Sequence, residues 1–400
     1  MESDRYGTPF QEGRFNKTRL SALRSVIHMV PDIHFEKGMH CIDCHTSWDV
    51  MGEGNIYSRM EEQVEIRCRD CHGTGSDPPS KRVIGDDNDY AVWASQTFPW
   101  WSVEPEDEVA VSSRGRPLIN VINGPTGWVL HGKVDGKIHP VQVITGKPGP
   151  HTMPGHERLE WSACHSSWAP QCYGCHDYRF KAKKQLDPNT GISTSGRWRE
   201  TQGYYRFEDL ELGVDDRGKI SPYMPGCQVL FSEIDDKGKP VLPYKNYVFK
   251  GGQLLSGIVS APIDPHTTRR EVRPCESCHL DPKPLGIGVG FVSWGDRWSE
   301  NHFLPIHDSL REGLPFSFAM ESLVDPTGHP LQGNSHYGAR PFDKEELKRI
   351  LRVGTCLPCH DQYKDPIYRN WKASLRKDFS STHLEAIQGS IKATGESEWR

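Results

Sequence analysis

The stretch Cys41-Ile-Asp-Cys44-His45 sets a pattern that recurs four more times along the chain. Two copies lie near the start, one lies in the middle and two lie in the last third. The copies comprise Cys41, Cys44 and His45; Cys68, Cys71 and His72; Cys172, Cys175 and His176; Cys275, Cys278 and His279; and Cys356, Cys359 and His360. With 12 Cys and 19 His in 400 residues, random placement gives about 0.02 copies of this pattern. The repeats are therefore not compositional noise.

Cys-x-x-Cys-His is the attachment motif of a c-type haem. The two thiols add across the vinyl groups of the porphyrin, and the adjoining His reaches the iron from the same side. Structural zinc uses Cys-x-x-Cys pairs, four ligands to one ion, and does not require a His after every second Cys. The sequence therefore predicts five covalently bound haems c.

The composition bears on the fold. Hydrophobic residues make up 35% of the chain, which also contains 38 Gly and 30 Pro, so much of it is expected to be loop. Buried porphyrins are large apolar bodies that replace part of a side-chain core. We therefore expect a mostly irregular and α-helical multihaem cytochrome c scaffold with β-hairpin insertions, in which the haems form the core.

Local patterns predict the regular elements. Strands separated by turns are expected at 117–122, 128–134 and 138–144, and a second hairpin at 228–234 and 241–249 around Asp235-Asp236-Lys237-Gly238. Asp343 and Glu346 form a capping signature, and Gly354 ends the helical pattern just before Cys356.

These patterns divide the chain into five segments. Haem-binding segments are expected at 1–80 with two motifs, at 151–200 with one full and one degenerate motif, and at 263–400 with two motifs. A β-rich insertion at 81–150 and a β-hairpin insertion at 201–262 separate them.

The degenerate copy is Trp161-Ser-Ala-Cys164-His165, in which Trp stands in place of the first Cys. Cys164 and Cys227 are the two Cys outside the full motifs. Three interpretations remain open. Cys164 could hold a sixth haem through one thioether with His165 as its proximal ligand, the site could be a vacant former site, or Cys164 could pair with Cys227 in a disulfide.

A low-spin haem needs a second axial ligand, usually imidazole or thioether. Histidines outside the motifs are numerous enough for bis-His ligation of every haem. The candidate distal ligands are His34, His40, His151, His156, His266, His302, His307 and His336.

Two stretches carry a family resemblance. Arg158-Leu-Glu-Trp161-Ser-Ala-Cys164-His165-Ser-Ser-Trp168-Ala-Pro-Gln-Cys172-Tyr-Gly-Cys175-His176 and the region from Arg273 to Gly288 resemble the multihaem cytochromes c that include octahaem tetrathionate reductases and hydroxylamine oxidoreductase-like proteins. The resemblance implies closely packed haems and a location outside the cytoplasm. Family enzymes carry eight haems, whereas this chain has five full motifs and no Cys-x-x-Cys-Lys. No catalytic residue is therefore carried over, and the catalytic residues are unknown.

Three functions compete. The leading one is electron transfer between redox partners through closely packed, mostly bis-His haems. The alternative is a haem-dependent reductase or oxidase of small sulfur or nitrogen oxyanions, of the tetrathionate, nitrite or hydroxylamine type, with one open iron position. The third is a haem-stapled structural subunit that forms filaments.

Charge and hydropathy limit the partners. The net charge is −5 and no long basic run occurs, so nucleic acid is not expected as a partner. No apolar stretch reaches 18 residues, so no membrane span is expected. Expected partners are other redox proteins or haem subunits, with homo-oligomers or filaments as a further form.

The expected location is the periplasm or the cell exterior, because c-type haem is attached outside the cytoplasm. The chain begins Met1-Glu2-Ser3-Asp4-Arg5 without a hydrophobic segment, so an export signal is expected to lie upstream of this sequence.

Overall fold

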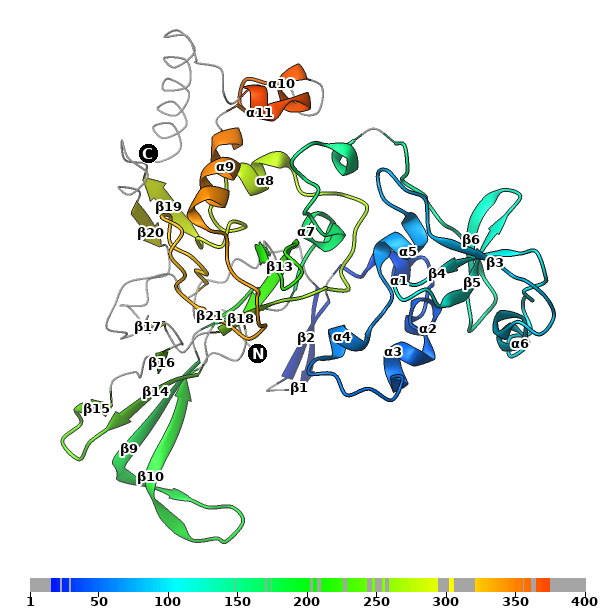
Figure 1. Cartoon of the computed structure of the whole chain (residues 1–400). Helices are drawn as coiled ribbons and strands as arrows, with labels where there is room; N and C mark the ends of the chain where they lie inside the picture. The colour runs from blue at the N-terminus through cyan, green and yellow to red at the C-terminus, as the bar shows by residue number, and fades with distance from the viewer. Residues whose placement is uncertain are drawn as a thin grey trace. The chain divides into compact units, whose positions relative to one another are not determined.

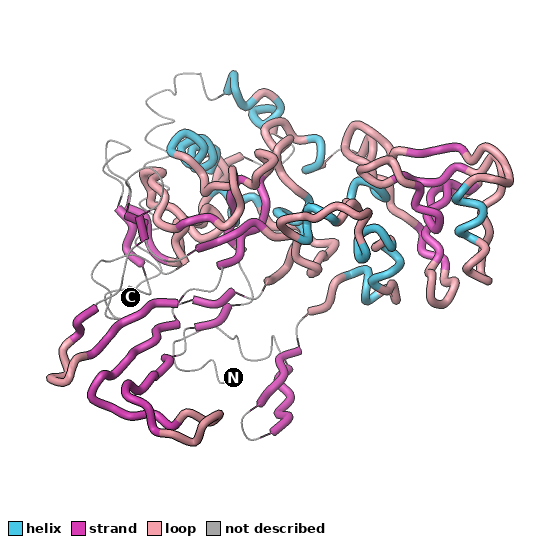
Figure 2. Tube along the Cα trace, turned by 60° about the horizontal axis from the view of Figure 1, so that its bottom comes forward, coloured by secondary structure: helices cyan, strands magenta, loops and turns pink. Residues whose placement is uncertain are grey.

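The computed structural model describes residues 16–21, 24–28, 30–147, 149–169, 171–173, 175–201, 204–206, 210–225, 229–242, 247–248, 254–255, 259–293, 302–305, 321–354, 356–360 and 365–374. Figures 1 and 2 show its helices and strands. The chain divides into two compact units. The small unit comprises residues 31–157 and 363–376, and the large unit comprises residues 1–30, 158–362 and 377–400.

The small unit combines short helices with one sheet. Its helices are α1 (Ile33–Glu36), α2 (Cys41–Cys44), α3 (Ser47–Met51), α4 (Met60–Gln63), α5 (Cys68–His72), α6 (Tyr90–Ser95), the 3-10 helix η2 (Pro150–Thr152), α10 (Pro366–Arg369) and α11 (Trp371–Ser374). Its strands are β3 (Lys81–Val83), β4 (Glu108–Val111), β5 (Pro117–Gly124), β6 (Gly127–His131) and β7 (Ile138–Pro140). These strands form an antiparallel sheet in chain order.

Each face of this sheet packs on a different partner. Ala110, Leu118, Val121 and Leu130 form a buried cluster that contacts Cys71 of the second motif. Val109 is the neighbour of Ala110 in β4, so its side chain points to the opposite face, where it packs with residues of α6. The sheet thus supports the second motif on one face and α6 on the other.

The large unit is built mainly from strands. Its helices are α7 (Trp161–His165), α8 (Cys275–His279) and α9 (Lys344–Gly354). Its strands are β1 (Asn16–Ser21), β2 (Arg24–His28), β8 (Gln171–Tyr173), β9 (Cys175–Leu186), β10 (Ser193–Thr201), β11 (Tyr204–Arg206), β12 (Glu211–Val214), β13 (Ile220–Pro225), β14 (Val229–Ile234), β15 (Pro240–Leu242), β16 (Tyr247–Val248), β17 (Leu254–Leu255), β18 (Val259–Pro262), β19 (Gly290–Ser293), β20 (His302–Pro305) and β21 (Gly333–Asn334).

Two four-stranded sheets organise these strands, with the orders β10-β9-β14-β15 and β12-β13-β18-β21. In the first sheet β9 and β10 form a long antiparallel hairpin, and β14 pairs with β9 in parallel. In Figures 1 and 2 the tip of this hairpin extends away from the rest of the large unit.

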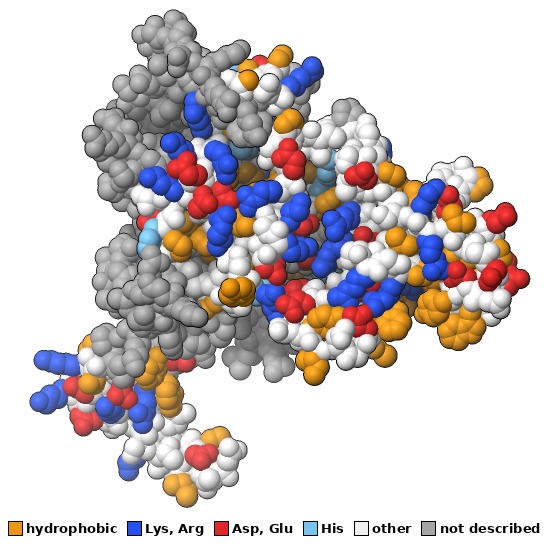
Figure 3. Space-filling model, in the orientation of Figure 1, with side chains coloured by type: hydrophobic (Ala, Val, Ile, Leu, Met, Phe, Trp, Pro, Cys, Tyr) orange, Lys and Arg blue, Asp and Glu red, His pale blue; other side chains and the backbone are white. Residues whose placement is uncertain are grey.

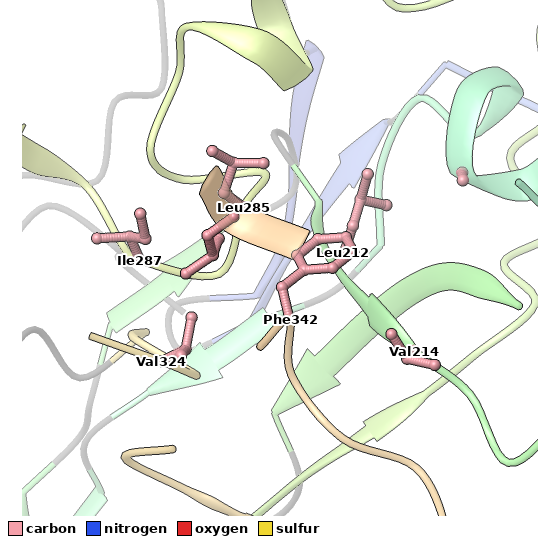
Figure 4. Packing of buried hydrophobic residues seen from close by; sticks show 8 residues of the cluster. Leu212, Val214, Leu285, Ile287, Val324 and Phe342 are labelled. Atoms are coloured by element: carbon pink, nitrogen blue, oxygen red, sulfur yellow. The ribbon is translucent and has the colours of Figure 1, made fainter. Parts of the chain in front are cut away.

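The core of the large unit lies between its helices and the second sheet (Figure 4). Leu212, Leu285, Ile287 and Phe342 are buried there with Ala163 of α7 and Leu347 of α9, and Cys278 of the fourth motif packs against them. The degenerate and fourth motifs are therefore fixed to one apolar cluster.

The expectation of a mostly irregular and α-helical scaffold is wrong. Strands predominate over helices, in antiparallel and mixed sheets, and among the described residues only α9 is longer than six residues. The physical reason is visible in β9, where Tyr178 and Phe180 alternate with Arg179 and Lys181. A period of two favours a strand. Each unit also packs apolar side-chain clusters of its own.

The predicted local elements are present, but several are shorter than expected. The strands expected at 117–122, 128–134 and 138–144 correspond to β5, β6 and β7, and β7 ends at Pro140. The second hairpin corresponds to β14 and β15, but β15 ends at Leu242, and β16 within the expected strand pairs with β17. In the turn of that hairpin, the Asp235 carboxylate accepts the backbone N–H groups of Lys237 at 2.9 Å and Lys239 at 2.7 Å. Such a turn closes locally, which explains why sequence alone could identify it.

The capped helix before Cys356 is also confirmed as α9. The Glu346 backbone N–H donates to Asp343 Oδ1 at 2.9 Å, and the Asp343 N–H donates to Glu346 Oε2 at 3.0 Å. The buried Glu346 also accepts hydrogen bonds from Arg158 at 2.7 Å and Arg340 at 2.6 Å. These bonds join the start of α9 to two other segments of the large unit.

No helix in the described part of the chain is both long and apolar enough to cross a bilayer.

Candidate haem-attachment sites

Four motif copies form short helices. The first, second, degenerate and fourth copies coincide with α2, α5, α7 and α8. Residues three and four apart lie on the same face of a helix. One turn therefore places the two Cys and the His of a full motif on one side of the backbone. The fifth copy also turns, since the His360 N–H donates to the Cys356 carbonyl at 3.0 Å.

The third copy differs in its backbone. Cys172 lies in β8, and Cys175 and His176 begin β9. His176 is opposite Thr201 of β10 and Leu230 of β14. The side chains of these three motif residues lie outside the described part of the structure.

Aspartates cap the first two motif helices. Asp43 Oδ2 accepts the His40 N–H at 2.7 Å, and Asp70 Oδ2 accepts the Arg67 N–H at 2.8 Å. Each Asp stands directly before the second Cys of its motif, at the third helical position, where a carboxylate can reach back to the N-cap. Burial raises the pKa of Asp70 to about 6.

The sheet of the small unit anchors the first motif. Asn120 of β5 donates to the Asp43 carbonyl at 2.9 Å, and the Lys133 N–H donates to Asp43 Oδ1 at 2.7 Å. Lys133 Nζ donates to the Ile42 carbonyl at 2.6 Å, and burial lowers the pKa of Lys133. The first motif is thus held by a strand and a loop far from it in sequence.

The histidine rings of the described motif helices share one arrangement, in which Nδ1 contacts an oxygen that acts only as an acceptor. The contacts are His45 to Asp49 Oδ2 at 3.0 Å, His72 to the Gln142 carbonyl at 2.8 Å, His165 to the Arg269 carbonyl at 2.9 Å, and His279 to the Ile350 carbonyl at 2.8 Å. Nδ1 is therefore the donor in each ring, and Nε2 is the nitrogen that carries the lone pair in the neutral tautomer. Metal-binding histidines are typically oriented in this way.

Thiols from different motifs lie near one another. Burial raises the pKa of Cys71, and the Cys44 thiol raises it further. Burial raises the pKa of Cys164 to about 11, and Cys278 adds to that effect. Cys164 is a free thiol, and Cys227 lies outside the described residues. The first motif thus neighbours the second, and the degenerate motif neighbours the fourth.

The end of α9 packs closely on the fourth motif. A Cβ atom added to Gly354 would lie 2.1 Å from the His279 carbonyl oxygen, which is far inside van der Waals contact. The same helix supplies the Ile350 carbonyl that holds the His279 ring. Cys356 of the fifth motif follows Gly354 by two residues, so the fourth and fifth motifs are joined through α9.

Apolar side chains are exposed around the first motif. Exposed apolar side chains on α1, α2 and α3 include Phe35 at 69%, Ile42 at 49%, Val50 at 65% and Met51 at 86%. Figure 3 shows hydrophobic side chains on the surface in the region where Figure 1 places α3 and α4. Exposed apolar surface of this kind suits an apolar ligand, and a porphyrin is such a body.

The candidate distal histidines are placed differently. The structure brings His34 of α1 next to His72 of the second motif, with ring centres 6.0 Å apart. His40 is the exposed N-cap of α2, His151 lies in η2, His156 follows it in a loop, and His266 is exposed after β18.

The remaining candidates lie in the large unit. His336 is in a turn where its N–H donates to Asn334 Oδ1 at 2.9 Å. His302 begins β20, and its side chain is outside the described part of the structure. His307 lies outside the described residues altogether.

Sequence reasoning missed His139. It is 8% exposed, the least of the described histidines, and its Nε2 has no hydrogen-bond partner among the described residues. Burial lowers its pKa, and the charges of Lys137 and His34 act in the same direction. His139 lies opposite Leu130 across β6 and β7, so it faces the side of the sheet that contacts Cys71. The sequence signal for its burial was its central position in the short strand Ile138-His139-Pro140.

Comparisons with protein-family models, with curated proteins and with solved structures find no match. Within the described ranges, no three side chains of His, Cys, Asp or Glu converge on one point as a cluster of metal ligands would.

Proposed function

We propose that this protein is a multihaem c-type cytochrome that carries electrons between redox partners outside the cytoplasm. The observation that carries the proposal is the common state of the motif histidines. In three full motifs Nδ1 is held by an oxygen acceptor, which leaves Nε2 for iron. Haem supplies a one-electron iron couple, and the chain sets its potential through ligands, burial and hydrogen bonds.

The pairing of motifs supports electron transfer in particular. The Cys44 thiol of the first motif is close enough to raise the pKa of Cys71 in the second, and the fourth and fifth motifs are joined through α9. Haems attached at such neighbours would be close enough to exchange electrons. The resemblance to multihaem cytochromes c points in the same direction, and it also favours a periplasmic or extracellular location. Other redox proteins or haem subunits are the proposed partners.

The test is a haem count on protein produced in a host that matures c-type cytochromes. We expect the intact mass to exceed that of the polypeptide by five haems, or by six if Cys164 also forms a thioether. The matched control replaces Cys356 and Cys359 by Ser and should contain one haem fewer. Protein that matures fully and carries no covalent haem would overturn the proposal, and fewer than five haems would show that not all motifs are occupied.

A second measurement separates a carrier from an enzyme. A carrier with bis-His haems has no open iron position, so its ferric spectrum should be low-spin and insensitive to added nitrite, hydroxylamine or tetrathionate. A high-spin signal that shifts when one of these compounds is added would favour the reductase or oxidase alternative.

A further inference from the structure

The rings of His34 and His72 lie side by side in the small unit. They come from different helices, α1 and α5, and their centres lie 6.0 Å apart with an angle of 45° between the ring planes. A metal bound between two imidazoles, at about 2 Å from each nitrogen, separates the ring centres by about 6 Å. The observed spacing therefore matches an axial pair with a metal between the rings.

Both rings direct Nδ1 at an oxygen acceptor, as axial ligation through Nε2 requires. His34 Nδ1 contacts Asp32 Oδ1 at 2.8 Å, and His72 Nδ1 contacts the Gln142 carbonyl at 2.8 Å. Both oxygens are acceptors, so each Nδ1 donates, and Nε2 is the nitrogen that carries the lone pair in the neutral ring. An ordinary aromatic contact between two histidines can have similar spacing, but it gives no reason for both Nδ1 atoms to be held by acceptors.

Each ring is also held in place by the backbone. Asp32 caps α1, because its Oδ1 accepts the His34 N–H at 2.8 Å, and the same carboxylate orients the ring. The Ile144 N–H donates to the His72 carbonyl at 3.1 Å, two residues beyond the carbonyl that holds the His72 ring. The Asp32 carboxylate therefore orients the His34 ring, and the loop that contains Gln142 and Ile144 orients the His72 ring.

We infer that His34 is the axial ligand opposite His72, at the iron of the haem attached to Cys68 and Cys71. This inference rests on the proposed function. It also assigns a role to that haem. With His34 and His72 both bound, the iron would have no open position, so these residues would hold a haem that relays electrons and binds no substrate. Asp32 is its positioning residue, since a carboxylate on the outer nitrogen makes an imidazole a more basic ligand.

The test replaces His34 by Ala in fully matured protein. We expect the number of covalent haems to stay the same, while one haem equivalent changes from low-spin to high-spin in the electron paramagnetic resonance spectrum. Added imidazole should restore the low-spin signal. The control His329→Ala removes an exposed histidine of the large unit and should leave every haem low-spin.

Two further variants keep the inference falsifiable if His34→Ala matures poorly. His34→Met retains a ligand of similar size, and it should produce a thioether-to-iron charge-transfer band and raise the potential of one haem. Asp32→Asn keeps a good helix cap and should leave all haems low-spin while raising the potential of one of them.

The outcomes are distinguishable. A His34→Ala protein with a full complement of low-spin haems, or a His34→Met protein without the charge-transfer band, would overturn this inference and leave the proposed function standing. Wild-type protein without covalent haem would overturn the proposed function itself.

Discussion

Replacing Glu346 by Gln is expected to loosen the start of α9 and, through it, the support of the fourth motif. Burial raises the pKa of Glu346, but hydrogen bonds from Arg340 and Arg158 outweigh that effect and bring the pKa down to about 2. The neutral amide keeps the shape of the side chain and loses the charge. Because Ile350 of the same helix holds the His279 ring, the substitution also tests how that ring is supported.

The magnitude follows from the pKa. A carboxyl group titrates near 4.3 in an unfolded chain, and each unit of difference corresponds to about 1.4 kcal/mol. Two units would give about 3 kcal/mol, but the partner side chains Arg340 and Arg158 are 43% and 41% exposed. Solvent screening reduces the effect to about 1.5 kcal/mol. Because the folded pKa is depressed, this stabilisation is complete above about pH 4.3 and disappears as the pH falls towards 2.

Amide hydrogen exchange in α9 measures the effect locally. At pH 7 the protection of residues 347–354 should fall about tenfold in Glu346→Gln. Glu345→Gln changes an exposed neighbour and should leave protection unchanged. The difference between wild type and Glu346→Gln should shrink below pH 4. Equal protection in both proteins at pH 7, or a difference that persists at pH 2, would refute the reasoning.

Three further outcomes are expected. Gly354→Ala should force α9 away from the His279 carbonyl and destabilise the large unit by about 1–3 kcal/mol, as measured by thermal unfolding, whereas Gly85→Ala, with open space around it, should not. A redox titration should place most haems at negative midpoint potentials, since paired imidazoles favour ferric iron, and potentials clustered well above zero would contradict bis-His ligation. Cys164→Ala should leave electron transfer nearly unchanged, because Trp161 stands where a full motif has its first Cys and we expect no haem to be attached there. The loss of one haem from the intact mass would show instead that Cys164 forms a thioether.

Local features of the fold were predictable from sequence, and non-local ones were not. The turn at Asp235 and the cap at Asp343 are each completed by residues within four positions, so their signals are contained in a short window. The parallel pairing of β14 with β9 joins residues such as Leu230 and His176, and no local pattern specifies it. The motifs favour short helical turns, whereas the alternation of Tyr178 and Phe180 with Arg179 and Lys181 in β9 favours a strand.

The same distinction applies to the candidate site. The motif residues follow from spacing alone. The choice of His34 among eight candidate distal histidines depends on a contact between α1 and α5, and the burial of His139 depends on the pairing of β7 with β6. The residues next to His34 and His139 in sequence specify neither of these contacts.

The contact between Gly354 and the His279 carbonyl has a consequence for the rate of electron transfer. Electron tunnelling between carriers weakens exponentially with the thickness of protein between them, so small separations matter more than the identity of the intervening atoms. At this position a missing side chain lets the backbone before the fifth motif touch the backbone of the fourth. That separation is fixed by main-chain packing and not by mobile side chains. If haems are attached at the fourth and fifth motifs, the rate of electron transfer between them would vary little with the thermal motion of the surface, and a single added methyl group would be enough to slow it.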